Sequence, residues 1–276
     1  MAGDSSTKAM GSLYDLLLDY VDTAWTHDST YEISSRLLEH YDELPKLSLR
    51  EMSELCFVSQ ASFSRFCRHL GFEDFADFKR ALDSTSYRLV DDYTRGFVQR
   101  LAADDGEALG AYRASLAEVM DSALTPENVA AAEALLDALE QADHVVLLSH
   151  HFPWHICRYL QGKLLQLGWY VQAPQSFQHQ LEAVEALGPR DLAIVCSVNG
   201  TYSSHYQPIM RGLFESGARL AAITQNRHAL FLNRVDVVLG CGNSNDNDVG
   251  KYALLMTIDY LVMSAIRRRQ LGDGTR

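Results

Sequence analysis

The chain has 276 residues, 47% of them hydrophobic and 22% charged, and a formal net charge of −12 at pH 7. This composition excludes a disordered or fibrous protein, and the length allows two domains with separate cores. No run of about 18 apolar residues occurs and residues 1–10 lack a basic leader, so we expect no membrane span, no secretory signal and a cytoplasmic location. The five cysteines lack C-x-x-C spacing, and we expect buried, reduced thiols.

The first part of the chain is predicted to be entirely helical. Amphipathic periodicity favours helices over residues 11–26 and 30–42, and Pro45 separates these two helices from the next one. Ser48 and Glu51 then form an S-x-x-E capping box, which marks the start of another helix.

After a break at residues 56–58, Ser59 can cap a further helix. An apolar stripe at i, i+3, i+4 and i+7 runs along it, and Gly71 is the expected C′ residue. The stripe consists of Phe63, Phe66, Cys67 and Leu70, and the next helix is patterned by Phe75, Phe78 and Leu82.

The opposite face of the helix after Ser59 carries small, polar and basic residues. Two helices joined by a short turn, with such a face on the second, are typical of a helix-turn-helix that enters the major groove of DNA. We expect base contacts from Gln60, Ala61, Ser62 and Arg65, with Ser59 and Ser64 beside them, and phosphate contacts from Arg68, His69, Lys79 and Arg80. The alternative is an ordinary three-helix cap with a polar outside.

The charge of this region differs from that of the whole chain. Residues 46–80 carry six basic and five acidic side chains, so the acidity of the chain lies elsewhere. We therefore expect modest, salt-sensitive DNA binding that needs a dimer.

We divide the chain into a helical head (1–84), a helical connector that can mediate dimer contacts (85–125) and an α/β domain (126–276). In the α/β domain, continuous apolar runs alternate with helical periods, which predicts a doubly wound parallel sheet covered on both faces. The expected strands are 144–148, 169–172, 192–197, 219–224 and 235–239, and the expected helices are 126–140, 154–167, 178–187, 204–216 and 248–267. Arg267–Arg269 either favour the end of the last helix or touch DNA.

Ligands of parallel sheets bind at the carboxyl ends of the strands. The loop after strand 192–197 combines hydroxyls, an amide and a glycine at the start of a helix, which is typical of a phosphate cradle and equally of an ordinary serine-capped turn. The candidate residues are Ser197, Asn199, Gly200, Thr201, Tyr202 and Ser203, with His150 and His151 after the first strand.

A metal site is a further hypothesis for the histidines. His151 and His155 are spaced i, i+4, but Pro153 lies between them and no acidic or cysteine partner is spaced to complete the site. We therefore expect neither a metal nor a cofactor.

The stretch from Val58 to Lys79 resembles the helix-turn-helix of the RpiR-type sugar-responsive transcription regulators. Their motif reads roughly V-S-x-A-T-x-x-R-F-x-x-x-L-G-[FY]-x-x-F-x-x-[FL]-K. The matching residues are Val58, Ser59, Ala61, Arg65, Phe66, Leu70, Gly71, Phe72, Phe75, Phe78 and Lys79, and Ser62 replaces the threonine. The resemblance implies a transcription regulator that binds a double-stranded DNA operator.

The α/β domain is similar to the SIS phosphosugar-binding domain that follows the helix-turn-helix in these regulators. Ser197 and Gly200 match its S-x-S-G-x-T loop, whereas Asn199 and Tyr202 replace a serine and the threonine. Where the family has G-x-G-x-S, residues 149–153 lack both glycines and place a proline at the hydroxyl position. The resemblance implies a small-molecule effector, such as a sugar phosphate, in an altered pocket.

The leading hypothesis is thus a homodimeric or homotetrameric regulator whose α/β domain senses a metabolite. A second hypothesis keeps DNA binding but gives the α/β domain only an assembly role. A third is a phosphosugar isomerase with Glu182, Glu185 or a histidine as general base. The altered first loop and the lack of G-x-S-x-G, Walker A, G-x-G-x-x-G and H-E-x-x-H motifs argue against an enzyme, and we assign no catalytic residue.

Overall fold

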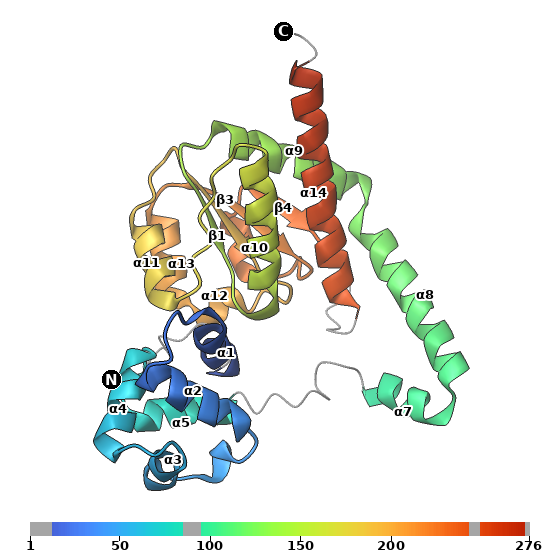
Figure 1. Cartoon of the computed structure of the whole chain (residues 1–276). Coiled ribbons are helices and arrows are strands. Elements are labelled where there is room, and N and C mark those ends of the chain that lie inside the picture. Colours follow the sequence, from blue (N-terminus) through green and yellow to red (C-terminus); the bar gives the residue numbers. More distant parts are fainter. Residues whose placement is uncertain (1–12, 85–94, 243–248, 274–276) are drawn as a thin grey trace. The chain divides into compact units, whose positions relative to one another are not determined.

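The computed structural model describes residues 13–84, 95–242 and 249–273. The chain divides into two compact units, Met1–Tyr87 and Arg88–Arg276, each with its own hydrophobic core (Figure 1).

The first unit is helical, as the sequence predicts, and side-chain caps set the starts of its helices. Asp28 accepts hydrogen bonds from the amides of Thr30 and Tyr31, and Ser48 and Glu51 form the predicted capping box. Its elements are α1 (Leu13–Thr23), α2 (Ser29–Glu39), the 3-10 turn η1 (Leu44–Lys46), α3 (Leu49–Leu55), α4 (Gln60–His69) and α5 (Phe75–Ser84).

Aromatic side chains hold α4 and α5 together in the core of this unit. The ring of Phe78 lies edge-on to Phe63 at 5.8 Å and to Phe72 at 5.4 Å between centroids. All three rings are buried, and such edge-to-face pairs add about 0.5–1.5 kcal/mol each to the hydrophobic gain.

The second unit is built on a four-stranded parallel sheet with the order β1-β2-β3-β4. Its strands are β1 (Val145–Leu148), β2 (Leu192–Cys196), β3 (Arg219–Thr224) and β4 (Val237–Gly240), and nearly every strand residue is buried. Burial on both faces explains why these segments are continuously apolar in sequence.

The strand expected at residues 169–172 is not formed, which corrects one prediction. Only Gln172 pairs in parallel with β1: its amide donates to the Val145 carbonyl (2.9 Å) and its carbonyl accepts from the Leu147 amide (2.7 Å). Pro174 follows two residues later and has no N–H to continue a ladder. The segment therefore extends the β1 edge by a single pairing.

Helices cover both faces of the sheet. Figure 1 shows α10 and α14 on one face and α11 and α13 on the other. The helical elements of this unit are α7 (Arg95–Ala103), α8 (Asp105–Ala123), α9 (Pro126–Gln141), α10 (His151–Gln166), α11 (Phe177–Glu185), α12 (Tyr202–His205), α13 (Gln207–Glu215), η2 (Leu230–Arg234) and α14 (Gly250–Asp273). The single helix expected over 204–216 is divided at Tyr206, because Pro208 opens the first turn of α13.

Helix α8, which we expected to be part of a connector, packs along α14 within the second unit. Val119 and Ala123 of α8 are buried against Val249 and Ala253. The hydroxyl of Tyr112 donates to that of Tyr252 at 3.2 Å.

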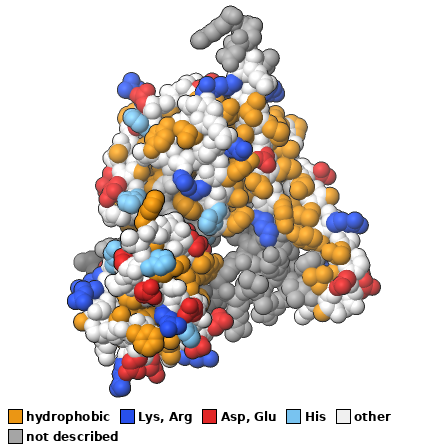
Figure 2. Space-filling view, in the orientation of Figure 1, with side chains coloured by type: hydrophobic (Ala, Val, Ile, Leu, Met, Phe, Trp, Pro, Cys, Tyr) orange, Lys and Arg blue, Asp and Glu red, His pale blue; other side chains and the backbone are white. Residues whose placement is uncertain are grey.

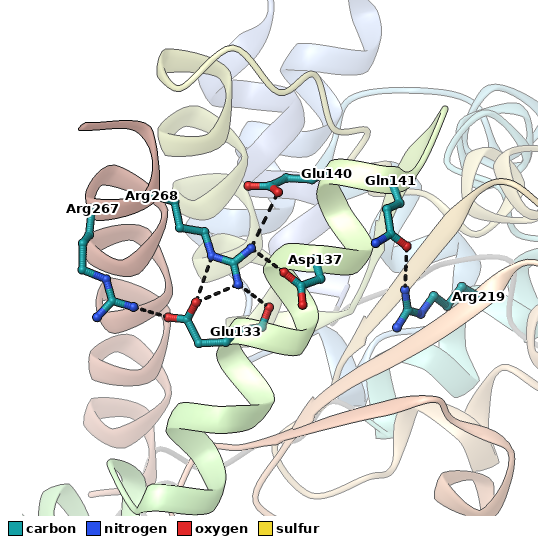
Figure 3. A network of polar contacts seen from close by, with 7 residues as sticks. All are labelled: Glu133, Asp137, Glu140, Gln141, Arg219, Arg267 and Arg268. Atoms are coloured by element: carbon teal, nitrogen blue, oxygen red, sulfur yellow. Dashed lines mark hydrogen bonds and ion pairs between the residues drawn. The ribbon is translucent and has the colours of Figure 1, made fainter. Parts of the chain in front are cut away.

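The arginines at the end of α14 bind acidic side chains of α9 (Figure 3). Arg268 contacts Glu133 through two guanidinium nitrogens, at 2.9 and 2.7 Å, and Asp137 at 2.6 Å. Arg267 binds the same Glu133, and the guanidinium of Arg269 stacks 4.6 Å from the Trp169 ring centre. These contacts give the arginines a structural role that joins α14 to α9 and to the segment that follows α10.

We predict that Arg268→Ala lowers the free energy of unfolding of the second unit by about 2 kcal/mol, because it removes a partly buried guanidinium that donates to both Glu133 and Asp137 of α9. The matched variant Arg267→Ala removes a more exposed side chain, 59% against 21%, from the same carboxylate and should cost less than about 1 kcal/mol. Urea unfolding of both variants checks the prediction. Equal effects would show that the geometry of Arg268 is unimportant.

Candidate DNA-binding and effector sites

Helix α4 is oriented by the burial of its apolar stripe. Phe63, Phe66 and Cys67 are at most 4% exposed, so the opposite face of the helix must point outward. The helix begins at Gln60, and the Ser59 side chain caps it by accepting from the Ser62 amide at 3.1 Å.

The residues predicted to contact bases lie on this outward face. Gln60, Ala61 and Arg65 are exposed, and Ser62 and Ser64 are half-buried beside them. Arg65 donates from Nη2 to the Ser62 hydroxyl at 3.1 Å, which holds its guanidinium over the start of the helix. The front of α4 therefore presents an arginine, an amide and hydroxyls together.

Of the residues predicted to contact phosphates, Arg68 and His69 are exposed near the end of α4. Arg68 donates from Nε to the Ser64 carbonyl at 3.3 Å. Arg80 is exposed on α5 and forms an ion pair with Asp77 at 3.1 Å.

Lys79 differs from the expectation. Its ammonium donates to the carbonyls of Leu44, Pro45 and Leu47 at 2.9, 2.7 and 2.7 Å. A lysine ammonium has three donors, so these bonds occupy all of them. Lys79 therefore anchors η1 to α5, and we leave it out of the DNA-contacting set.

The turn between α3 and α4 has a conformation that sequence reasoning missed. Phe57 has φ +55° and is 80% exposed, a backbone region that glycine normally occupies. Its amide donates to the Glu54 carbonyl (3.1 Å) and the Val58 amide to the Ser53 carbonyl (2.9 Å), so a phenylalanine fills the C′ position. The predicted C′ residue of α4, Gly71, has φ +98°.

In the second unit, the loops after β1 and β2 form the candidate effector site. Gln172 pairs with one side of β1, and β2 pairs with the other side. The chain therefore crosses from one side of β1 to the other, which makes this a topological switch point, and ligands of open α/β sheets bind at such points. The two loops bring together His150, His151 and the residues from Ser197 to Ser203.

The loop from Ser197 to Ser203 is held tightly. The Ser197 hydroxyl accepts from the Tyr202 amide at 3.2 Å, and the Ser203 hydroxyl donates to the Gly200 carbonyl at 3.0 Å. Gly200 has φ +73°, and a Cβ there would come within 2.9 Å of the Ala229 side chain. Asn199 and Thr201 are exposed, so their polar groups remain accessible to a ligand.

Tyr202 points into the protein instead. Its side chain is fully buried, and its hydroxyl donates to the Gln180 side-chain carbonyl. Gln180 in turn donates to the Ser149 carbonyl at 2.8 Å. Tyr202 thus ties the loop after β2 to α11 and to the loop after β1, which is a structural role.

His150 lies at the centre of a cluster of rings. The centroids of His151, Tyr202, His205 and Tyr206 lie 4.8, 5.6, 6.2 and 5.3 Å from its own. Its Nδ1 atom is buried and has no hydrogen-bond partner among the described residues. Burial, together with the neighbouring His151 and His205, lowers the pKa of His150 to about 3, so the imidazole is neutral at physiological pH.

Sequence reasoning did not place His205 and Tyr206 in this site. They stand three and four residues after Tyr202, a helical spacing that could have indicated a shared neighbourhood. His151 has φ +52°, so the backbone at one expected glycine position keeps a left-handed conformation although the residue is a histidine.

Neither a metal centre nor a membrane span emerges from the described residues. No group of three histidine, cysteine or carboxylate side chains gathers there in a way that could hold a metal ion. No helix in the same part of the chain combines the length and apolarity needed to cross a bilayer.

We predict that His150 makes the folded protein sensitive to acid. The unfolded chain takes up a proton on this imidazole near its usual pKa of 6.5, whereas the folded state does so only near about 3. The free energy of unfolding should therefore fall as pH decreases from about 7 to about 5, by up to about 1 kcal/mol per pH unit. Denaturant unfolding of wild type and His150→Gln across this window isolates the effect, and parallel pH profiles would refute it.

Comparison with known proteins shows which families and folds this chain resembles. Residues 26–87 match the model of the helix-turn-helix domain of the rpiR family. A relative from Haemophilus influenzae, described as an uncharacterized HTH-type transcriptional regulator, is 24% identical over 260 residues, which cover 91% of this chain and 86% of the relative.

Solved structures share the fold. The Vibrio vulnificus NanR protein, complexed with ManNAc-6P, aligns with a TM-score of 0.52 and 14% identity over 91% of this chain and 92% of its own. A phosphoheptose isomerase from Francisella tularensis aligns with a TM-score of 0.51 and 16% identity over 59% of this chain and 99% of its own. Residues 26–87 therefore form a helix-turn-helix domain of the rpiR family, and the chain shares the fold of NanR and, over 59% of its length, that of the phosphoheptose isomerase.

Proposed function

We propose that α4 enters the major groove of an operator and reads bases with Gln60, Ala61, Ser62 and Arg65. The observation that carries this proposal is the exposure of Arg65 and Arg68 on the face of α4 opposite the buried Phe63, Phe66 and Cys67. Arginine can bind the guanine edge bidentately, and small residues at the front of the helix allow close approach. Arg68, His69 and Arg80 are then available for phosphates.

We infer that two helical heads bind DNA together, because the net charge of one head is too small for strong binding. The near balance of six basic and five acidic residues between 46 and 80 gives each head little electrostatic attraction for DNA. A homodimer or homotetramer presenting two α4 helices to half-sites about 34 Å apart overcomes this weakness.

The second unit offers an apolar surface for this assembly. Figure 2 shows hydrophobic side chains gathered over α10 and α14. On α14 the exposed side chains of Tyr252, Leu255, Met263 and Ile266 recur at helical spacing along one stripe, and Phe152 and Tyr159 are exposed on α10. We infer that copies of the chain associate through this surface.

We further propose that the second unit senses a sugar phosphate or a related metabolite at the loops after β1 and β2. Support comes from the fold shared with NanR, which was solved with ManNAc-6P, and from the accessible Asn199 and Thr201. The imidazole of His150 is neutral, so it suits a hydroxyl group of a ligand better than a bare anionic charge.

One observation favours an assembly-only role as the second candidate. Tyr202 and His150 occupy the space between the two loops with their own rings, 5.6 Å apart, and His151 replaces a glycine that would allow close backbone approach. A second unit of this kind would hold the heads in register without a ligand.

We infer that the second unit is not an isomerase. Isomerisation needs a general base beside the substrate carbon, with a pKa near the working pH. Glu182 and Glu185 are exposed on α11, and Glu182 accepts from Gln178 of the same helix. His150 is a weak base because burial lowers its pKa to about 3.

We predict that Arg65→Ala combined with Arg68→Ala weakens binding to duplex DNA selected by the wild type from a random pool. Loss of one base contact and one phosphate contact should cost at least about tenfold in affinity and flatten the salt dependence. Titrations at several salt concentrations, with circular dichroism to confirm folding, measure both effects. Arg190→Ala, which removes an 84% exposed arginine from the second unit, is the control, and unchanged affinity of the double variant would refute the interface.

We predict that a sugar phosphate or sugar acid raises the melting temperature of the wild type and that Ser197→Ala with Thr201→Ala blunts the shift. Ser216→Ala changes a residue before β3, at the amino ends of the strands, and should leave the shift unchanged. A panel containing ManNAc-6P, other hexose and pentose phosphates and sugar acids tests this by thermal melts. A wild type that responds to none of them favours the assembly-only role.

A further inference from the structure

The loop after β3 connects the candidate effector loop with the end of helix α8. At the effector side, the Val198 carbonyl accepts from the amides of Gln225 (3.1 Å) and Asn226 (3.2 Å) and from the Thr224 hydroxyl (3.2 Å). The Asn226 side chain also donates to the Asn199 carbonyl at 3.0 Å. A displacement of residues 198–199 is therefore passed to the backbone of residues 224–226.

Steric contact reinforces these bonds. Gly200 lies so close to the same loop that a Cβ would meet the Ala229 side chain at 2.9 Å and the Asn226 amide nitrogen at 3.4 Å. Since closely packed groups transmit displacement, the two loops must move together.

At its far side, the loop holds a buried asparagine. Arg227 donates from Nη2 to the side-chain oxygen of Asn128 at 2.7 Å, and the Gly240 amide donates to the same oxygen at 3.1 Å. A Cβ at Gly240 would lie 2.3 Å from the Arg227 guanidinium, so only glycine leaves room for it. The side chain of Asn128 is 2% exposed, so its oxygen depends on Arg227 and Gly240 for hydrogen bonds.

Asn128 completes the route to α8. Its side-chain nitrogen donates to the carbonyl of Ala123, the last residue of the helix, at 2.7 Å. Gly242, which follows β4, fixes the same turn: a Cβ there would meet Ala253 of α14 at 3.0 Å and Val119 and Ser122 of α8 at 3.4 Å. In the sequence, α8 follows α7 and precedes α9, so it lies between the head and the sheet of the second unit along the chain.

We propose that Arg227 and Asn128 are positioning residues that couple the effector loop to the C-terminal turn of α8. Displacement of the effector loop moves Asn226, Arg227 loosens its hold on Asn128, and the C-terminal turn of α8 opens more readily. This inference rests on the proposed effector role, and it names the residues by which that role would reach the DNA-binding head.

The test uses hydrogen exchange of the full-length protein, read at the amides of residues 119–124, and needs no ligand. Gly200→Ala pushes the effector loop against Ala229 and should accelerate exchange in this turn by about fivefold or more. In an Arg227→Ala background, Gly200→Ala should add nothing, because the route is already cut. Arg227→Lys keeps one donor for Asn128 and should partly restore the response.

Gly217→Ala is the matched control. Gly217 also has φ +73°, but a Cβ there would make only an ordinary contact with Pro189, at 3.6 Å. It precedes β3 and so lies at the amino ends of the strands, away from the effector loop. Equal acceleration by both alanine variants, or additive effects of Gly200→Ala and Arg227→Ala, would overturn the coupling. If Gly200→Ala does not fold, Asn226→Ala takes its place with the same expected outcomes.

Ligand titration separates this inference from the proposed function. A wild type that responds to no metabolite but passes the exchange test has the coupling without the effector. A wild type that binds a sugar phosphate but fails the exchange test has the effector without this route.

Discussion

Burial of the apolar stripe of α4 is the interaction on which the DNA-binding head depends. Phe63, Phe66 and Cys67 pack into one cluster with Phe72 and Phe78 of the following segment. Because a helix has only one face opposite such a stripe, packing alone determines that Arg65 and Arg68 point outward. The chemistry of recognition is thus a consequence of hydrophobic burial, and the acidic charge of the whole chain has no bearing on the orientation of this helix.

In the second unit, the loops after β1 and β2 lie at the carboxyl ends of parallel strands, where open α/β sheets bind ligands, but side chains of the protein fill part of this place. A tyrosine and a histidine fill space between the loops, and a left-handed histidine stands where the family resemblance leads one to expect glycine. The left-handed backbone at His151 costs about 1–2 kcal/mol of strain, because the residue is not a glycine. This is the physical reason why effector sensing and pure assembly compete as explanations.

Local signals in the sequence were sufficient for much of the head. The capping box at Ser48 and Glu51, the cap at Ser59 and the C′ glycine at Gly71 each depend on a few neighbouring residues, and all three are present. The role of Lys79 was not predictable in this way, because its acceptors lie 32 to 35 residues earlier and meet it only after folding. The turn at Phe57 was also missed, since phenylalanine gives no signal for a positive φ. In the second unit, the periodicity located the four strands, whereas Gln172 and the ring cluster around His150 depend on tertiary packing.

The burial of the cysteines means that their reactivity toward thiol reagents reports whether each unit is folded. Cys56 and Cys67 lie in the first unit and Cys157, Cys196 and Cys241 in the second, all of them buried. Burial raises the pKa of Cys56 to about 11 and those of Cys67 and Cys241 to about 12, while a hydrogen bond with Cys157 and burial raise that of Cys196. Thiolate is the reactive form, so thiol reagents and mild oxidants should react slowly with these cysteines while both units are folded. Labelling at one set of cysteines and not the other would report which half of the regulator had opened.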